Sequence, residues 1–237
     1  MKLTIATPKA VRYACLNFHY AKAVPVSPLA YNVFNEKNEW CGVIIYSYGA
    51  TPNIGKPFGL VQGEICELVR VALNGKQECT SQAVAMSLKQ LHKDAPNVRL
   101  VVSYADCDQS HLGTIYQATN WIYTGVTDKG DLGAFIIHSG GKAKRVHRKS
   151  IHSRMVLIDG KMVHCPQTIA AVRQFIDPNA EVFFTQGKRK YLMPMDKRMK
   201  KQIAPLSKPY PKADADWHKI DREQFKKDKT NSNDKSL

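Results

Sequence analysis

The pattern of apolar and polar positions predicts strands and helices in turn over the first 140 residues. Residues 8–18 are one example: Val11, Ala14 and Phe18 recur at helical spacing, and Pro8 suits the first turn of a helix. Strands are expected at 3–7, 29–35, 40–48, 64–73, 98–105, 121–123 and 132–138, and further helices at 80–95 and 111–118. The expected order is β-α-β-β-β-α-β-α-β-β.

The segment from Val98 to Gly125 stands out within this order. It has an apolar strand, a polar turn, a short helix and an aromatic strand. Ser103, Tyr104 and Asp106 therefore stand where a parallel-type strand ends. In open α/β sheets that end faces the ligand crevice, so we expect a functional site here.

Beyond Gly141 the chain becomes basic. A run of Lys and Arg fills 142–149, and Asp159-Gly160 predicts a hairpin of strands 155–158 and 161–165. A helix is expected at 166–176, and a second hairpin of strands 181–185 and 191–193 with a basic tip at 186–190. The expected domains are a core at 1–141, a basic extension at 142–211 and a disordered tail at 212–237.

The charge distribution suggests a polyanionic partner. Residues 1–140 hold 12 Lys and Arg against 10 Asp and Glu, whereas residues 141–237 hold 23 against 10. Nucleic acid is the first expectation. A membrane is not expected, because no apolar run approaches the roughly 20 residues that span a bilayer. The beginning of the chain lacks the apolar stretch of a signal peptide, so we expect a cytoplasmic protein. The six cysteines form no CxxC pair, which favours buried thiols over a metal site.

The strand–turn–helix–strand order around Arg70-Val71-Ala72-Leu73-Asn74-Gly75 resembles the GNAT-type N-acyltransferase core. That resemblance implies an α/β (α+β) fold, with a mixed central sheet, flanking helices and here a basic extension with hairpins. It also implies that two parallel strands part and that the acyl donor lies in the gap. The donor's phosphates would lie at a helix N-terminus, with Arg70 and Gly75 beside the donor and Tyr116 protonating the leaving group.

Several further motifs resemble the Mom proteins of Mu-like bacteriophages. They are Asn17-Phe18-His19-Tyr20, Tyr46-Ser47-Tyr48-Gly49, Glu67-Leu68-Val69-Arg70, Ser103-Tyr104-Ala105-Asp106 and His111 to Trp121. The resemblance implies that adenine in phage DNA is converted to its carbamoylmethyl form, which resists host restriction enzymes. It further implies a transferase that flips its target base out of the duplex.

The expected catalytic residues are His19, Tyr20, Ser103, Asp106 and Tyr116. The exocyclic amine of adenine is a poor nucleophile, so it needs a base, and His19 and Asp106 both suit that role. Arg70 suits a phosphate or an oxyanion. Tyr46 and Tyr48, with Tyr104 and Trp121 as alternatives, are expected to stack on the flipped base.

The expected nucleic-acid contacts are Lys142, Lys144, Arg145, Arg148, Lys149, Lys188, Arg189 and Lys190. They imply double-stranded DNA as partner, with tRNA as a second nucleic acid and a homodimer as one assembly. No dedicated metal site is expected, although His19, Tyr20, Asp106 and Tyr116 are competent iron ligands. A DNA- or RNA-binding protein on a degenerate acyltransferase scaffold, and a conventional N-acetyltransferase, remain the alternatives.

The donor stays open between an acyl-coenzyme A and a glycyl ester such as glycyl-tRNA. Simple acyl transfer leaves an amide on the adenine amine, whereas a carbamoylmethyl group has a methylene there. A glycyl group could rearrange to the carbamoylmethyl product if its amine displaced the original nitrogen from the ring. Two nucleic-acid partners would also suit the basic half of the chain.

Overall fold

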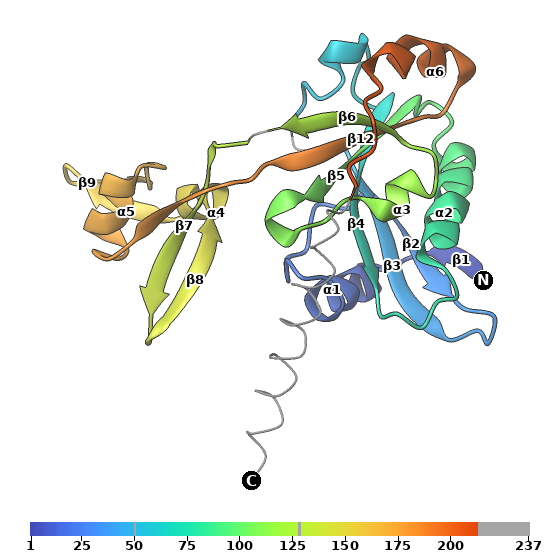
Figure 1. Cartoon of the computed structure of the whole chain (residues 1–237). Coiled ribbons are helices and arrows are strands. Elements are labelled where there is room, and N and C mark those ends of the chain that lie inside the picture. The colour runs from blue at the N-terminus through green and yellow to red at the C-terminus, as the bar shows by residue number, and fades with distance from the viewer. Residues whose placement is uncertain (50, 128, 213–237) are drawn as a thin grey trace. The chain divides into compact units, whose positions relative to one another are not determined.

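A computed structural model describes residues 1–49, 51–127 and 129–212 of the chain (Figure 1). The chain divides into two compact units. Among the described residues, the first comprises 1–103, 112–124 and 191–212, and the second comprises 104–111 and 125–190. Charge had suggested a boundary at 141/142, whereas both units are assembled from separate stretches of chain.

A seven-stranded sheet forms the framework of the first unit. In spatial order its strands are β1 (Lys2–Ile5), β2 (Leu29–Phe34), β3 (Trp40–Ser47), β4 (Ile65–Leu73), β5 (Leu100–Asp106), β12 (Lys188–Pro194) and β6 (Ile122–Thr127). Strands β1 to β4 pair antiparallel, whereas β4 and β5 pair parallel. The sheet is therefore mixed, which confirms the predicted α/β class.

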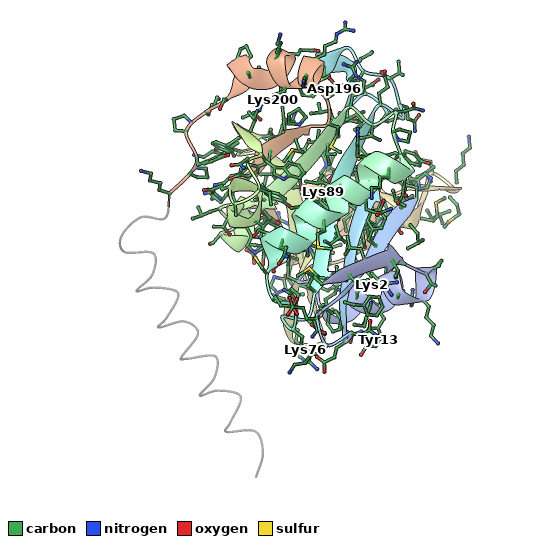
Figure 2. All side chains as sticks on the ribbon, turned by 90° about the vertical axis from the view of Figure 1, so that its right-hand side faces the viewer. Lys2, Tyr13, Lys76, Lys89, Asp196 and Lys200 are labelled. Atoms are coloured by element: carbon green, nitrogen blue, oxygen red, sulfur yellow. The ribbon has the colours of Figure 1, made fainter. Side chains whose placement is uncertain are left out.

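Helices α1 (Pro8–Asn17) and α2 (Thr80–Asp94) cover opposite faces of this sheet. Cys15 of α1 packs with Val43 and Ile45 of β3. The next side chain on the other face, Tyr46, shares a hydrogen bond of 2.7 Å with Ser87 of α2. Figure 2 looks onto α2, whose Lys89 points away from the sheet. Covering on both sides explains why β3 reads as a continuous apolar run rather than an alternating one.

The second unit contains a three-stranded sheet and a hairpin. The sheet has the order β11 (Glu181–Phe184), β7 (Leu132–Ser139) and β8 (Lys142–His147), and the hairpin pairs β9 (Met155–Ile158) with β10 (Lys161–His164). Helices α4 (Arg148–His152) and α5 (Ile169–Phe175) complete it. Phe135, Ile151 and Val172 are fully buried in a core shared by the sheet, both helices and the hairpin.

The remaining elements are short. Helix α3 (Thr114–Gln117) precedes β6, and α6 (Lys197–Ile203) follows β12; single 3₁₀ turns cover Lys56–Phe58, Cys107–Gln109 and Ala204–Leu206. The order of strands and α-helices up to residue 140 is the predicted one. The helices expected at 111–118 and 166–176 are shorter than predicted.

Two predictions for the basic half are wrong. Strands β11 and β12 do not form a hairpin: β11 pairs with β7, and β12 lies between β5 and β6. Residues 188–190 accordingly belong to a strand rather than to a basic tip. The run 142–149 forms β8 and the start of α4, because Gly140 and Gly141 both adopt positive φ (57° and 73°). Two such residues make the tight turn that returns β7 as a hairpin.

The disordered tail predicted for 212–237 lies outside the described residues except for Lys212. Of the cysteines, Cys15, Cys41, Cys66 and Cys165 are buried, as the apolar sequence around most cysteines suggested. Across residues 1–49, 51–127 and 129–212, every helix is too short or too polar to cross a bilayer.

Candidate functional site

The parallel strands β4 and β5 part within the sheet. Their ladder pairs only Ile65 to Leu68 with Leu100 to Ser103, although β4 continues to Leu73. On its other side β4 shifts register against β3 at the same level: Ile45 faces Arg70 and Tyr46 faces Leu68, so Val69 is an extra residue. Such a bulge bends its strand and raises its twist, which turns β4 away from β5.

Two hydroxyl groups lie where the ladder ends. The oxygen of Ser103 is 2.7 Å from the Leu68 carbonyl and 2.8 Å from the Tyr116 hydroxyl. A carbonyl can only accept, and a serine has one hydroxyl proton. Ser103 therefore donates to Leu68, and its oxygen accepts the proton of Tyr116. The serine replaces the ladder partner that Leu68 loses and orients the phenol of Tyr116.

Tyr116 is held as a neutral phenol. Burial raises its pKa to about 12, although the positive charge of Arg70 opposes that rise. The phenol of Tyr20 and the carboxylate of Glu67 raise the pKa of Tyr116 further. The predicted residues Tyr20, Arg70, Ser103 and Tyr116 therefore share one electrostatic environment. A protonated phenol in that setting suits a general acid.

The guanidinium of Arg70 is only partly satisfied. Its Nη1 donates to the carbonyl of Val69 at 2.7 Å, while its buried Nε has no hydrogen-bond partner. A buried donor without a partner costs about 1–3 kcal/mol, so an anionic acceptor at this position would be stabilised. Arg70 thus has the properties expected of a donor-binding residue.

His19 and Tyr20 follow α1 and lie against each other, with ring centroids 4.4 Å apart. The Nδ1 of His19 accepts from the Ala21 N–H at 3.1 Å. A neutral ring that accepts at Nδ1 has its proton on Nε2 and cannot take another there. His19 in this tautomer is suited to donate, whereas the sequence predicted a base.

Glu67 is a site residue that the sequence reasoning missed. It lies on β4 between Cys66 and Leu68, and its carboxylate raises the pKa of both Cys66 and Tyr116. The signal was present, because a lone acid inside a central apolar strand rarely lacks a partner or a function. Glu67 is therefore a third candidate base beside His19 and Asp106.

A cavity of about 400 Å³ opens beside the first turns of α2 and the end of α3. Its lining includes Ser81 and Gln82 from α2, Thr119 and Asn120 after α3, and Met193 of β12. The thiol of Cys79 precedes the helix, and hydrogen bonds from Ser81 and the Gln82 N–H lower its pKa. The same first-turn amides favour phosphate, so this cavity suits the phosphates of a donor.

Gly75 does not lie in that helix turn. It belongs to the turn after β4, where Asn74 caps the Lys76 N–H, and α2 begins only at Thr80. Its φ is +84°, and no atom lies within 4 Å of where a side chain would begin. The glycine satisfies a left-handed turn, and nothing in its surroundings marks a close approach to phosphate.

The aromatic candidates separate by burial. Tyr46 and Trp121 are fully buried, and Tyr46 bonds to Ser87. The expectation that Tyr46 stacks on a flipped base is therefore corrected: a ring enclosed between β3 and α2 cannot reach a ligand. Tyr48 is half exposed and remains able to stack.

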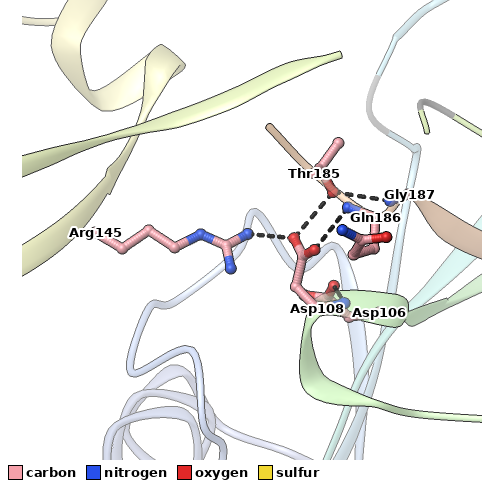
Figure 3. A network of polar contacts seen from close by, with 6 residues as sticks. All are labelled: Asp106, Asp108, Arg145, Thr185, Gln186 and Gly187. Atoms are coloured by element: carbon pink, nitrogen blue, oxygen red, sulfur yellow. Dashed lines mark hydrogen bonds and ion pairs between the residues drawn. The ribbon is translucent and has the colours of Figure 1, made fainter. Parts of the chain in front are cut away.

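Asp106 and Asp108 lie in the second unit and are hydrogen-bonded (Figure 3). Asp106 caps the Asp108 N–H at 3.0 Å. Asp108 accepts from Arg145 at 2.6 Å, Thr185 at 2.9 Å and the Gln186 N–H at 2.7 Å. Burial raises the pKa of Asp108, but these three donors outweigh it and lower the pKa.

Arg145 therefore has a structural partner. Its guanidinium also lies 3.9 Å from the ring centroid of Phe183, a cation–π geometry. Arg148 bonds to Gln167, and Arg189 bonds to the backbone of His111. Burial lowers the pKa of Lys190. The exposed cations among those predicted for nucleic acid are Lys142, Lys144, Lys149 and Lys188, besides the engaged Arg145 and Arg148.

Three or more His, Cys, Asp or Glu side chains do not gather as a metal site anywhere in the described part of the chain. The predicted iron ligands were His19, Tyr20, Asp106 and Tyr116. Of these, Asp106 belongs to the second unit and the other three to the first.

The comparison by sequence finds a family whose model matches most of the chain, whereas the comparison by structure finds only distant likenesses. The model of the Mom protein family matches residues 1–212. No curated protein matches significantly. Among solved structures, a Bacillus subtilis acetyltransferase in complex with CoA is 8% identical with a TM-score of 0.40, covering 82% of this chain and 99% of that one.

Two further solved structures are similar at the same level. A spermidine N-acetyltransferase from Vibrio cholerae is 8% identical, with a TM-score of 0.40 and coverage of 86% and 99%. A GNAT family acetyltransferase from Elizabethkingia anophelis with acetyl-CoA bound is 11% identical, with a TM-score of 0.39 and coverage of 82% and 97%. No activity is transferred from likenesses this distant.

Proposed function

Because the chain belongs to the Mom protein family, we propose that it is a transferase acting on the exocyclic amine of adenine in double-stranded DNA. The product is the carbamoylmethyl form of adenine, and the consequence is resistance of phage DNA to restriction. The reaction takes place in the first unit, where β4 and β5 part. The adenine reaches it flipped out of the duplex, and half-exposed Tyr48 stacks on it.

The observation that carries this proposal is the hydrogen bond between Ser103 and Tyr116 at the end of the β4–β5 ladder. It holds a neutral phenol beside Arg70 at an interruption of the sheet. An acyl transfer needs a proton for the leaving group and a positive charge for the developing oxyanion. Tyr116 and Arg70 supply these two functions.

In the transfer step the adenine amine attacks the acyl carbon of the donor, and a new C–N bond forms. The bond between the acyl carbon and its oxygen or sulfur breaks, and the leaving atom takes the proton of Tyr116. Glu67 removes the proton of the amine. Each proton and electron pair is thereby accounted for without a redox partner.

Counting nitrogen atoms favours a glycyl donor. Carbamoylmethyladenine has one nitrogen more than adenine, and an acetyl group brings none. Transfer of glycine leaves a glycyl amide whose free amine can attack the ring carbon. The original nitrogen then departs from the ring as the terminal carboxamide, so the product is an isomer of the amide. An acyl-coenzyme A remains the alternative, and the cavity beside α2 suits the phosphates of either donor.

The decisive experiment is mass spectrometry of nucleosides from plasmid DNA co-expressed with the chain. Modified adenine is expected with the wild type and loss of at least about 100-fold with Tyr116→Phe, since general acids contribute about 10²–10⁴-fold. Tyr46→Phe, which removes the hydroxyl of another buried tyrosine bonded to Ser87, serves as a folded control with smaller loss. Unmodified adenine in the presence of folded wild-type protein would leave a non-catalytic DNA-binding protein as the better interpretation.

The donor is identified with purified protein and duplex DNA. Product is expected with glycyl-tRNA and not with acetyl-coenzyme A. Product from acetyl-coenzyme A alone would exclude the glycyl route.

A further inference from the structure

The β9–β10 hairpin presents an apolar face to solvent. Leu157 and Met162 are direct partners across the hairpin, and each is 60% exposed. Met155, two residues before Leu157 on the same face, is 48% exposed and faces His164. Strand residues two apart share a face, so these side chains form one patch, which we call the hairpin face. Figure 1 labels β9, the strand that contributes Met155 and Leu157.

The opposite side of the hairpin packs on the core of the second unit. Val156 is buried, and Val163 and Ile158 pack on the core of the second unit. An ordinary surface hairpin would have polar residues on its outer side. Here both sides are apolar, and clustered exposed apolar residues mark a binding surface more often than single ones do.

Charge indicates which partner the hairpin face contacts. Between residues 142 and 164 the chain has seven Lys and Arg and a single acid, Asp159. Arg154 directly precedes β9, and Lys161 begins β10; both are exposed. A second copy of this chain would bring two positive surfaces together, and a partner of low charge would leave these cations unused. A polyanion that also offers apolar surface inside is the complementary choice, and duplex DNA has that character in its stacked bases.

We propose that the hairpin face is a wedge that enters duplex DNA and separates neighbouring base pairs. This inference rests on the proposed function, because a base modified inside the first unit must first leave the stack. Leu and Met are among the side chains that proteins insert between base steps, with flanking cations on the phosphates. Leu157 and Met162 form the tip of the wedge, and Arg154 and Lys161 contact the backbone on either side.

A neighbouring pair of histidines extends this surface. The rings of His152 and His164 lie 4.8 Å apart, and His164 Nδ1 is 3.0 Å from the His152 carbonyl. Because a carbonyl only accepts, the His164 N–H donates and the ring is fixed beside Met155. A fixed flat ring next to an apolar tip can stack on a base that the wedge exposes.

The test measures DNA distortion rather than modification. Full-length Leu157→Thr/Met162→Thr protein is compared with wild type, since threonine keeps strand propensity. The matched control is Val61→Thr/Leu206→Thr, two exposed apolar residues of the first unit. Permanganate reactivity of thymines in a plasmid fragment reports unstacking. Wild type and control are expected to increase the permanganate reactivity. With the wedge variant, that increase is expected to be about tenfold smaller.

Rescue distinguishes a wedge from a general loss of affinity. A duplex with mismatched pairs is already unstacked, so the wedge variant is expected to bind it as tightly as wild type does. Circular dichroism and the melting temperature verify that the variant is folded, and Leu157→Thr alone provides a milder version. Equal permanganate reactivity of wild type and wedge variant, or no rescue by mismatches, would overturn the proposal.

Two other outcomes are separable. Binding of wild type to anionic phospholipid vesicles that the wedge variant loses would assign the hairpin face to a membrane instead. Failure of the proposed function has its own signature: DNA distorted by wild type, yet no modified adenine by mass spectrometry.

Discussion

Ser103 and Tyr116 lie 2.8 Å apart through their hydroxyl groups, at the last rung of the β4–β5 ladder. The serine faces the Leu68 carbonyl on one side and the phenol on the other. The serine consequently makes two hydrogen bonds, to the Leu68 carbonyl and with the phenol. Tyr116 makes only the one with Ser103 through its hydroxyl. That asymmetry makes the two residues separable by experiment.

Ser103→Ala is expected to destabilise the protein more than Tyr116→Phe does. The alanine leaves both the Leu68 carbonyl and the buried phenol without a partner, each costing about 1–3 kcal/mol. The phenylalanine removes its own donor only, and Ser103 still bonds to Leu68, so about 1 kcal/mol is expected. Urea unfolding measures both. Equal losses would show that the serine does not serve Leu68.

The ionisation of Tyr116 gives a pH prediction. Its pKa is raised to about 12 in the folded protein, against about 10 in an unfolded chain. The folded state thus binds the extra proton between these values, and stability from this group falls as pH rises through that window. Absorbance titration of wild type and Tyr116→Phe should coincide at pH 10–11. In denaturant, wild type is expected to show one tyrosinate more than Tyr116→Phe. The same difference between the two folded proteins at pH 10 would refute the raised pKa.

The order of elements up to residue 140 was predictable because local patterns decide it. Helix α1 has a single apolar face and Pro8 in its first turn, and β3 is apolar throughout. The sequence also named Ser103, from the end of a parallel-type strand, and Tyr116, from the resemblance to the acyltransferase core, and the structure brings their hydroxyl groups together. Such signals are contained within a few neighbouring residues.

What failed depends on contacts between distant segments. β12 was paired with β11 because they are close in sequence, yet β12 enters the large sheet next to β5. Gly187, at φ +89°, has the Thr127 carbonyl so near that no side chain fits, and the chain leaves one sheet there for the other. Tyr46 was assigned to stacking because the sequence does not show that α2 buries it. That burial is a contact between distant segments. Glu67 was overlooked although its signal, a lone acid in an apolar strand, was local.

Two glycines with similar φ angles separate the cost of a steric clash from the cost of a left-handed backbone. Gly113 and Gly75 have φ of +74° and +84°, but a side chain at Gly113 would meet the Tyr191 ring at 2.4 Å, whereas Gly75 has open space. Gly75→Ala should cost about 1 kcal/mol from the left-handed backbone alone. Gly113→Ala should cost about 2–4 kcal/mol, because overpacking adds about 1–3 kcal/mol to the same backbone cost.

Thermal unfolding of both variants checks this, with wild type as reference. Gly75→Ala also reports on donor binding. Modification that survives in a stable Gly75→Ala protein would show that this glycine does not contact the donor, as its position before α2 indicates. Equal destabilisation by the two alanines would contradict the contact with Tyr191.

The carboxylate of Asp108 should stabilise the second unit in a pH-dependent way. Its side chain is 3% exposed and pairs with Arg145. Asp108→Asn is expected to cost about 2 kcal/mol at pH 7, less than a fully buried pair because Arg145 is partly exposed. The pKa of Asp108 is lowered from 3.8, so its contribution is complete above pH of about 4 and is lost as pH falls through the folded value.

Urea titrations of wild type and Asp108→Asn at pH 7 and pH 3 measure this contribution. The difference between the two proteins should shrink at the lower pH. A difference that persisted unchanged at pH 2 would mean that the hydrogen bonds of Asp108, and not its charge, supply the stability.

Lys142 and Lys144 should account for DNA affinity in a way that Arg145 does not. Both lysines are exposed on β8, whereas Arg145 bonds to Asp108 and lies over Phe183. Each phosphate contact contributes about 0.9 to the slope of log K against log salt. Lys142→Ala/Lys144→Ala should therefore lower that slope by about 2, equally for all sequences, and leave the melting temperature unchanged. Arg145→Ala should lower the melting temperature instead, because Asp108 loses its charged partner. A change in slope without a change in stability in that variant would place Arg145 on the phosphates after all.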